Sequence, residues 1–355
     1  MNTPIYPVSP TPEQAQALRS HLRRRANKAG GILLLFFVLS NLVSIPFLLL
    51  MRYGVSGRIG GELYSSLITL GSYTVQYLLV VPFLLWLNNR KTEDTLSRQL
   101  VRPQVSGGFL AKWTLIGFGC SYAVNYLFNF FFLFLQQLTG VELQAPSLVS
   151  QATLLDNIIT VVFFALVAPL MEEFLFRGGI LSDLRPYGNG FAVLATGFLF
   201  GLTHMNYQQI FYAAAMGIVA GFICVRARSL WPGVLLHFSL NLIGAIQSVL
   251  LGRVDPQALN ALMQGGGRAS AALAGSILPL LGVVLLALLC MGLCVAGVVV
   301  LLVELSKGKA AVALEQNGVY LPLSQKLAAF FTAPLMLLFL AVAAGMTILN
   351  ALGIG

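Results

Sequence analysis

Two adjacent glutamates, Glu172 and Glu173, stand at the end of an apolar run, and Arg177 follows shortly after them. A charged side chain inside a membrane is costly and usually has a function. Residues four apart share a helix face, so Glu173 and Arg177 are predicted to form an ion pair. Glu172 lies about 100° further around the helix. We therefore expect Glu172 to be free for chemistry, with Glu173 tied to the arginine.

Two histidines follow in later apolar runs and are grouped with other side chains at helical spacing. Phe200 and His204 share one helix face, and His237 and Asn241 share another. A carboxylate, two imidazoles and an amide on separate helices can hold and deprotonate a water molecule, with or without a divalent metal. The alternative for each histidine is an interhelical hydrogen bond without catalysis. The ion pair of Glu173 is interpreted as structural whatever the function is.

The elements that carry these residues are predicted to be transmembrane helices. Of the 355 residues 57% are apolar and 9% are charged, with a mean hydropathy of +0.84, whereas soluble proteins are about 25% charged. The fold class is therefore all-α, a polytopic helix bundle. Runs long enough to cross about 30 Å of hydrocarbon predict eight to nine spans, at roughly 31–51, 63–88, 109–138, 153–173, 190–206, 208–225, 230–250, 275–303 and 326–353.

The basic residues predict the orientation and the partners of the protein. With the N-terminus in the cytoplasm, 17 of the 21 lysines and arginines fall on the inner side, as the positive-inside rule requires. We expect a multi-pass protein of a prokaryotic plasma membrane that contacts membrane lipids. The net charge of +9 is assigned to cytoplasmic loops, and nucleic acid is not an expected partner. The sequence makes no prediction of the oligomeric state.

The chain is divided into four parts by these patterns. Residues 1–30 form a basic cytoplasmic segment, 31–150 the N-terminal membrane helices, 151–250 a catalytic core and 251–355 the C-terminal membrane helices. The first span is expected to remain as an anchor. Leu18–Lys28 is interpreted either as a solvated flank of that span or as a short amphipathic helix lying on the inner leaflet.

Three motifs in order carry a resemblance to a known family. Glu172-Glu173-x-x-x-Arg177, Phe200-x-x-x-His204 and His237-x-x-x-Asn241 resemble the motifs of the CPBP intramembrane proteases, also called the Abi or CAAX-protease-like family. The likeness covers about residues 150–250. Each motif is weak alone, but their order and spacing on apolar helices make the signal specific.

The resemblance implies a role for each matched residue. Glu172 with His204 would activate the attacking water, Arg177 would hold Glu173, and Phe200 would support the site. His237 with Asn241 would stabilise the oxyanion. A variant of the mechanism has Glu172, His204 and His237 bind a divalent metal such as zinc, for which a carboxylate would have to complete the two histidines. We favour a metal-independent or weakly bound metal mechanism.

The predicted function is hydrolysis of a peptide bond in a membrane-associated protein or peptide, without an acyl-enzyme. Among family roles, maturation of a peptide pheromone or bacteriocin suits this chain better than CAAX processing. Two other hypotheses stay open: a non-catalytic immunity or accessory protein that binds through the same polar chamber, and a proton-coupled transporter. The depth of the site also stays open, because a full-length helix over 190–206 would place His204 deeper than Glu172.

Overall fold

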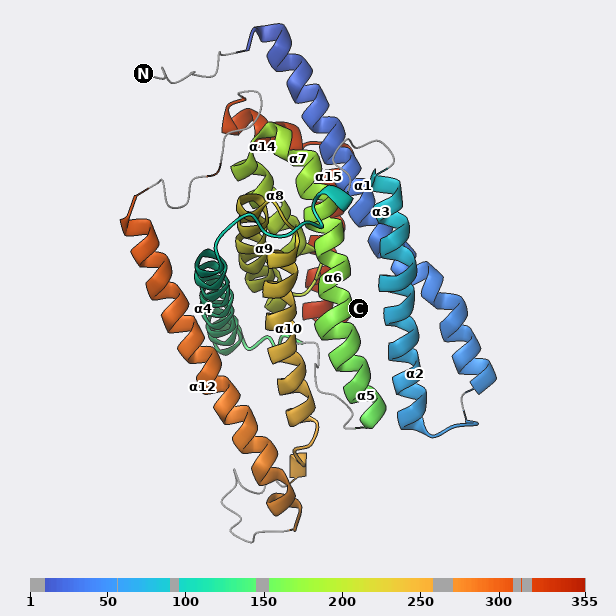
Figure 1. Cartoon of the computed structure of the whole chain (residues 1–355). Helices are drawn as coiled ribbons and strands as arrows, with labels where there is room; N and C mark the ends of the chain where they lie inside the picture. Colours follow the sequence, from blue (N-terminus) through green and yellow to red (C-terminus); the bar gives the residue numbers. More distant parts are fainter. Residues whose placement is uncertain are drawn as a thin grey trace.

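The described part of the chain is a helical bundle without strands (Figure 1). The computed structural model describes residues 10–55, 57–89, 96–144, 153–257, 271–308, 314 and 321–354. The predicted all-α class is confirmed. The helices in chain order are α1 (Pro12–Leu50), η1 (Met51–Val55), α2 (Gly61–Tyr73), η2 (Thr74–Val80), α3 (Val81–Asn89), η3 (Leu96–Arg98), α4 (Gly107–Thr139), α5 (Leu154–Ile159), η4 (Thr160–Val167), α6 (Ala168–Glu173), η5 (Phe174–Leu181), α7 (Ser182–Leu184), η6 (Arg185–Tyr187), α8 (Asn189–Leu202), α9 (Tyr207–Ala227), α10 (Trp231–Leu251), α12 (Ala271–Ser306), α14 (Leu323–Phe331) and α15 (Pro334–Ala351).

Eight helical segments among the described residues are long and apolar enough to cross a membrane. They include the predicted spans except the one at 190–206, which is α8 and has only 14 residues. The predicted last span, 326–353, is also different. It consists of α14 and α15, and the second helix begins at Pro334, whose fixed φ suits a first helical turn.

The first span is one continuous helix that begins well before its apolar part. Thr11 and Gln14 form a capping box at the start of α1, which satisfies free backbone donors there. Leu22 and Ala26 are fully buried. The alternative of a separate amphipathic helix on the inner leaflet is therefore wrong for 18–28, because this stretch packs into the bundle as part of α1. The polar residues 1–9 lie outside the described part of the chain.

Two spans change from α- to π-helical hydrogen bonding immediately before a proline. The Val81 amide donates to the carbonyl of Gln76, and the Ala168 amide donates to that of Phe163, five residues back in each case. Pro82 and Pro169 follow directly. Because a proline ring clashes with the preceding turn and has no N–H, the wider π turn accommodates it. Such π segments are frequent at functional sites.

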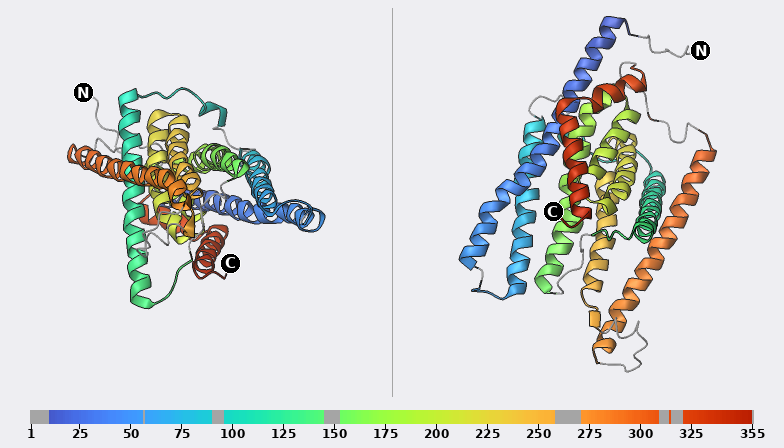
Figure 2. Two further views of the ribbon diagram at one scale, coloured as in Figure 1. Left: turned by 90° about the horizontal axis from the view of Figure 1, so that it is seen from below. Right: turned by 180° about the vertical axis from the view of Figure 1, so that it is seen from behind.

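Close helix contacts in the centre of the bundle depend on glycines. A Cβ at Gly197 of α8 would lie 2.7 Å from the backbone nitrogen of Ile218 on α9, and one at Gly201 would lie 2.3 Å from the carbonyl oxygen of Ile210. The pair α8 and α9 therefore packs backbone against backbone. On the other side α4 lies steeply across α12, in contact at Gly119 and Gly297 (Figure 2).

The short helix α8 brings His204 to the level of Glu172. Glu172 lies about four helical turns before the end of its span at Tyr187, and α8 then runs back by about four turns. Because the two runs have similar lengths and opposite directions, the turn that carries His204 lies near the level of Glu172 and Glu173. The site lies in the middle of the helical segment Leu154–Tyr187, not at its end.

Candidate active site

Glu173 and Arg177 form the buried foundation of the site, and the predicted ion pair is confirmed. Nη1 of Arg177 lies 2.9 Å from Oε1 of Glu173, and both side chains are fully buried. Nη2 of Arg177 donates to the carbonyl oxygen of Gly217 on α9 at 2.9 Å. A buried charge must be paired, and this arrangement pairs the carboxylate while tying its helix to α9.

His237 of α10 lies between the two glutamates. Its Nδ1 lies 3.1 Å from Oε1 of Glu173, and its Nε2 lies 3.7 Å from Oε2 of Glu172. An ionised carboxylate only accepts hydrogen bonds. Nδ1 of His237 therefore carries a hydrogen and donates a hydrogen bond to Glu173. The held Nδ1 fixes the ring and turns Nε2 toward Glu172.

Glu172 has a hydrogen-bonding partner that the sequence did not predict. Its Oε1 accepts a hydrogen bond of 2.7 Å from the hydroxyl of Tyr77, and its side chain is 16% exposed. The described structure contains no hydrogen bond or ion pair between Glu172 and His204. Both residues line the same cavity, and α10 brings His237 against both glutamates. The joint role of Glu172 and His204 stays a prediction.

His204 lies in the tight turn between α8 and α9. Its Nδ1 lies 3.0 Å from the carbonyl oxygen of Phe200, which can only accept, so Nδ1 donates and Nε2 is left as an acceptor. The next residue, Met205, has a positive φ of 49°, which is rare for a side chain of this type. Its carbonyl accepts a hydrogen bond of 2.9 Å from Asn350 of α15. The C-terminal helix therefore holds the turn.

Phe200 supports both imidazoles from one buried position. Its ring makes edge contacts with His204 and His237, at centroid distances of 5.0 and 5.3 Å. The guanidinium of Arg177 lies 4.9 Å from the ring centroid, within the range of a cation–π contact. With 1% of its surface exposed, Phe200 is a packing residue between the ion pair and the two histidines.

Asn241 is held by a backbone carbonyl that the π segment leaves free. In η4 each backbone N–H bonds to the carbonyl five residues earlier, so the carbonyl of Phe164 would accept from residue 169. Residue 169 is a proline and has no N–H. Nδ2 of Asn241 donates to this carbonyl at 2.9 Å. An amide nitrogen has two N–H groups, so one remains for a ligand.

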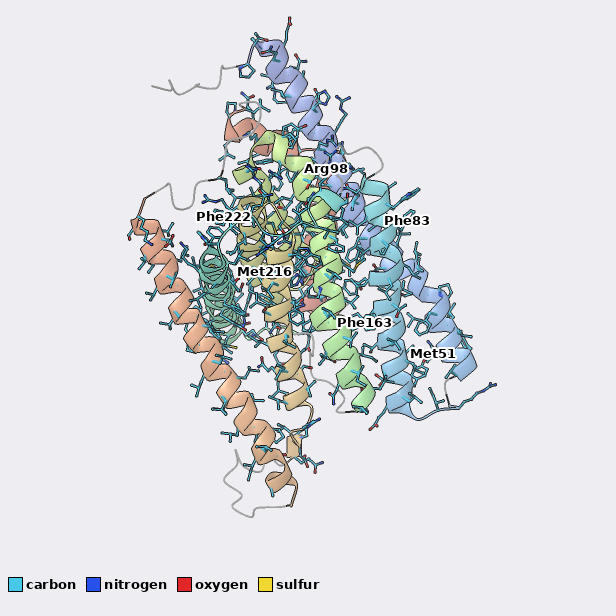
Figure 3. All side chains as sticks on the ribbon, viewed as in Figure 1. Met51, Phe83, Arg98, Phe163, Met216 and Phe222 are labelled. Carbon is cyan, nitrogen blue, oxygen red and sulfur yellow. The ribbon has the colours of Figure 1, made fainter. Side chains whose placement is uncertain are left out.

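The predicted residues converge on one cavity of about 340 Å³. Glu172, His204, His237, Asn241 and Phe200 all line it, whereas Glu173 and Arg177 lie behind the wall. Met216, labelled in Figure 3, marks its level within the bundle. The other lining residues are apolar or uncharged polar and are Phe36, Tyr73, Gln76, Tyr77, Val81, Phe164, Ala168, Leu175, Phe176, Thr203, Asn206, Gln209, Tyr212, Ala213 and Leu240.

The predicted zinc variant needs Glu172, His204 and His237 to bind one metal ion. No group of three or more histidine, cysteine, aspartate or glutamate side chains in the described part of the chain is arranged to hold a metal ion. Oε1 of Glu172 and Nδ1 of each histidine are bonded to protein groups, which leaves Oε2 of Glu172 and the two Nε2 atoms as the possible ligands. We route no chemical step through a metal, and the zinc variant stays a prediction.

Comparison with known proteins finds a family match in the segment that carries these residues. Residues 154–243 match the family described as Type II CAAX prenyl endopeptidase Rce1-like. The predicted family resemblance is confirmed. The Rce1-like segment contains all seven predicted site residues. A membrane peptidase activity is the class of function that this match supports.

A similar protein is the "Putative membrane peptidase YdiL" of Bacillus subtilis (strain 168), with 28% identity over 82 residues. The match covers 23% of this chain and 34% of that protein, so the chain spans about a third of the relative's length. No solved structure matches the chain. Both matches are similarities over part of the chain, and they support a membrane peptidase at the level of the family.

Sequence reasoning missed two residues that the structure brings to the site, and both lie outside the Rce1-like segment. Tyr77 comes from the second span and contacts Glu172, whereas Asn350 comes from the last helix and holds the turn of His204. A tyrosine at position 73 precedes Tyr77 by one helical turn in an apolar span. This polar pair was the available signal, but nothing in the sequence says which helix it faces.

Proposed function

We propose that the cavity is the active site of an intramembrane endopeptidase that hydrolyses a peptide bond in a membrane-associated protein or peptide. One observation carries the proposal. Oε2 of Glu172 lies 3.7 Å from Nε2 of His237, whose other nitrogen is held by the buried Glu173. This separation is too long for a direct hydrogen bond and suits a water molecule beside the two acceptors.

The chemistry follows from the hydrogen-bonding capacity of each group. A water that donates to Oε2 of Glu172 and to Nε2 of His237 turns a lone pair toward the cavity. As its oxygen attacks the scissile carbonyl, one proton passes to Glu172 as general base. The second N–H of Asn241 stabilises the oxyanion. The C–N bond then breaks, and Glu172 gives the proton to the leaving amine.

His204 completes the polar wall of the cavity. With Nδ1–H donated to the Phe200 carbonyl, its Nε2 is an acceptor for the N–H of the scissile amide. Among the residues that the structure describes, no lysine, arginine or aspartate lines the cavity. We therefore expect uncharged side chains next to the cleaved bond, because an unpaired charge in such a cavity is costly.

The test is to map new protein and peptide termini in membranes of cells that produce the wild type, Glu172→Gln or Glu62→Gln. The amide is nearly isosteric but accepts no proton, so cleavage products should disappear in Glu172→Gln. Glu62 is an exposed glutamate at the start of α2, and its variant should give the wild-type products.

An unchanged set of termini in Glu172→Gln would refute the protease mechanism. If that variant still protected cells against a bacteriocin, the non-catalytic binding hypothesis would replace it. Proton-coupled uptake into proteoliposomes by the wild type, lost in Glu172→Gln, would instead support the transporter.

A further inference from the structure

Tyr77 makes the shortest polar contact of the proposed general base, and it comes from outside the family-matched segment. Its hydroxyl lies 2.7 Å from Oε1 of Glu172. Because an ionised carboxylate has no proton to give, the phenol is the donor. A hydrogen bond to a charged acceptor is roughly twice as strong as one between neutral groups. The bond is shielded from solvent, since only 6% of Tyr77 is exposed.

The two oxygens of Glu172 are made different by this contact. Oε1 accepts from Tyr77, whereas Oε2 faces Nε2 of His237 at 3.7 Å. A lone pair of Oε1 is occupied and its electron density is drawn toward the phenol. The oxygen beside the imidazole is therefore the one left to accept a proton from water.

We infer that Tyr77 is a positioning residue, which orients Glu172 so that Oε2 acts as the base beside His237. This inference rests on the proposed function, in which Glu172 accepts the proton. It adds a residue of the second span to a site whose sequence-predicted residues all lie in 154–243. The catalytic carboxylate is thus aligned by a helix that the family match does not include.

The backbone of the second span holds Tyr77 in place. It lies in the π segment η2, five residues before Pro82. One turn earlier the ring of Tyr73 stacks on Phe163 of η4, with centroids 5.9 Å apart and planes inclined by 10°. The two π segments therefore face each other through aromatic rings, and η4 continues directly into α6 with Glu172. The hydroxyl is directed by packing, as a positioning role requires.

The first experiment compares Tyr77→Phe with Tyr64→Phe in the purified full-length protein. Tyr64 lies in the same span but does not line the cavity. The substrate probe is an internally quenched peptide built on a cleavage site found by the mapping of termini described above. We expect Tyr77→Phe to lower kcat about 10-fold, the value of one hydrogen bond to a charged group. KM should stay within about twofold because the phenyl ring remains.

The second experiment needs no substrate. Dicyclohexylcarbodiimide reacts with protonated carboxyl groups in apolar surroundings, and mass spectrometry of peptides locates the adduct. Loss of the phenol removes a donor that stabilises the carboxylate, so Glu172 should be labelled roughly 10-fold faster in Tyr77→Phe than in the wild type. Tyr64→Phe should be labelled at the wild-type rate.

These measurements separate the two proposals. If Glu172→Gln is inactive and Tyr77→Phe keeps the wild-type kcat and labelling rate, the role of Tyr77 is refuted and the protease mechanism stands. If Glu172→Gln keeps full cleavage, the protease mechanism is refuted. A parallel rise of KM in both tyrosine variants would indicate a general packing effect and would also overturn the inference.

Discussion

Replacing Arg177 by methionine should destabilise the fold strongly, because no other lysine or arginine of the described residues forms an ion pair with the carboxylate of Glu173. Nη1 of Arg177 lies 2.9 Å from Oε1 of Glu173, and both side chains are fully buried. Methionine keeps an unbranched apolar chain of similar shape. The change thus removes the charge and the bond to Gly217 while it leaves most of the packing.

The expected size of the effect follows from the burial. Breaking a buried ion pair by removing one partner costs about 3–5 kcal/mol, since an uncompensated charge remains. Adding Glu173→Gln removes that charge, and the amide oxygen still accepts from Nδ1 of His237. The double variant should therefore recover at least half of the lost free energy of unfolding, because apolar or neutral replacement of a whole pair is nearly neutral.

The assay is denaturant unfolding in detergent micelles, with Arg25→Met as a matched control. Arg25 is 39% exposed, and its partner Asp183 keeps a second cation, Lys28, at 2.7 Å. The control should lose less than about 1 kcal/mol. Equal destabilisation in Arg177→Met and in the double variant would refute the reasoning, as would a loss in Arg177→Met no larger than in the control.

Three further changes test the surroundings of the site. Gly233→Ala should cost about 1–3 kcal/mol of unfolding free energy, since its Cβ would lie 2.6 Å from Sγ of Cys224. The control Gly244→Ala lies in the same helix and should be nearly neutral, because its Cβ would lie 3.5 Å from the nearest atom. Asn241→Ala should abolish most peptide cleavage and also cost about 1–3 kcal/mol in thermal unfolding, because the Phe164 carbonyl loses its donor. Asn350→Ala should lower kcat by severalfold in the same peptide assay, because it releases the strained turn at Met205; wild-type kcat would show that this turn holds its shape unaided.

The sequence predicted the membrane class, most spans and the ion pair, because these depend on composition and on spacing within one helix. Glu173 and Arg177 are four residues apart, so their contact follows from helical geometry alone. The pairing of Glu172 with His204 depended on how separate helices are rotated, which spacing does not determine. The shortening of α8 was equally hidden, since its apolar run continues to the turn of His204.

Two prolines make the helical faces of their spans hard to predict from spacing. Each follows a π segment, and each stands five residues after a group that reaches the site: Pro82 after Tyr77, and Pro169 after Phe164. A π turn adds a residue to the turn and shifts the faces of a helix, so an α-helical projection of these spans places side chains on the wrong side. The same turn frees the carbonyl that holds Asn241. The π segments, which make an α-helical projection unreliable, thus also position groups of the site.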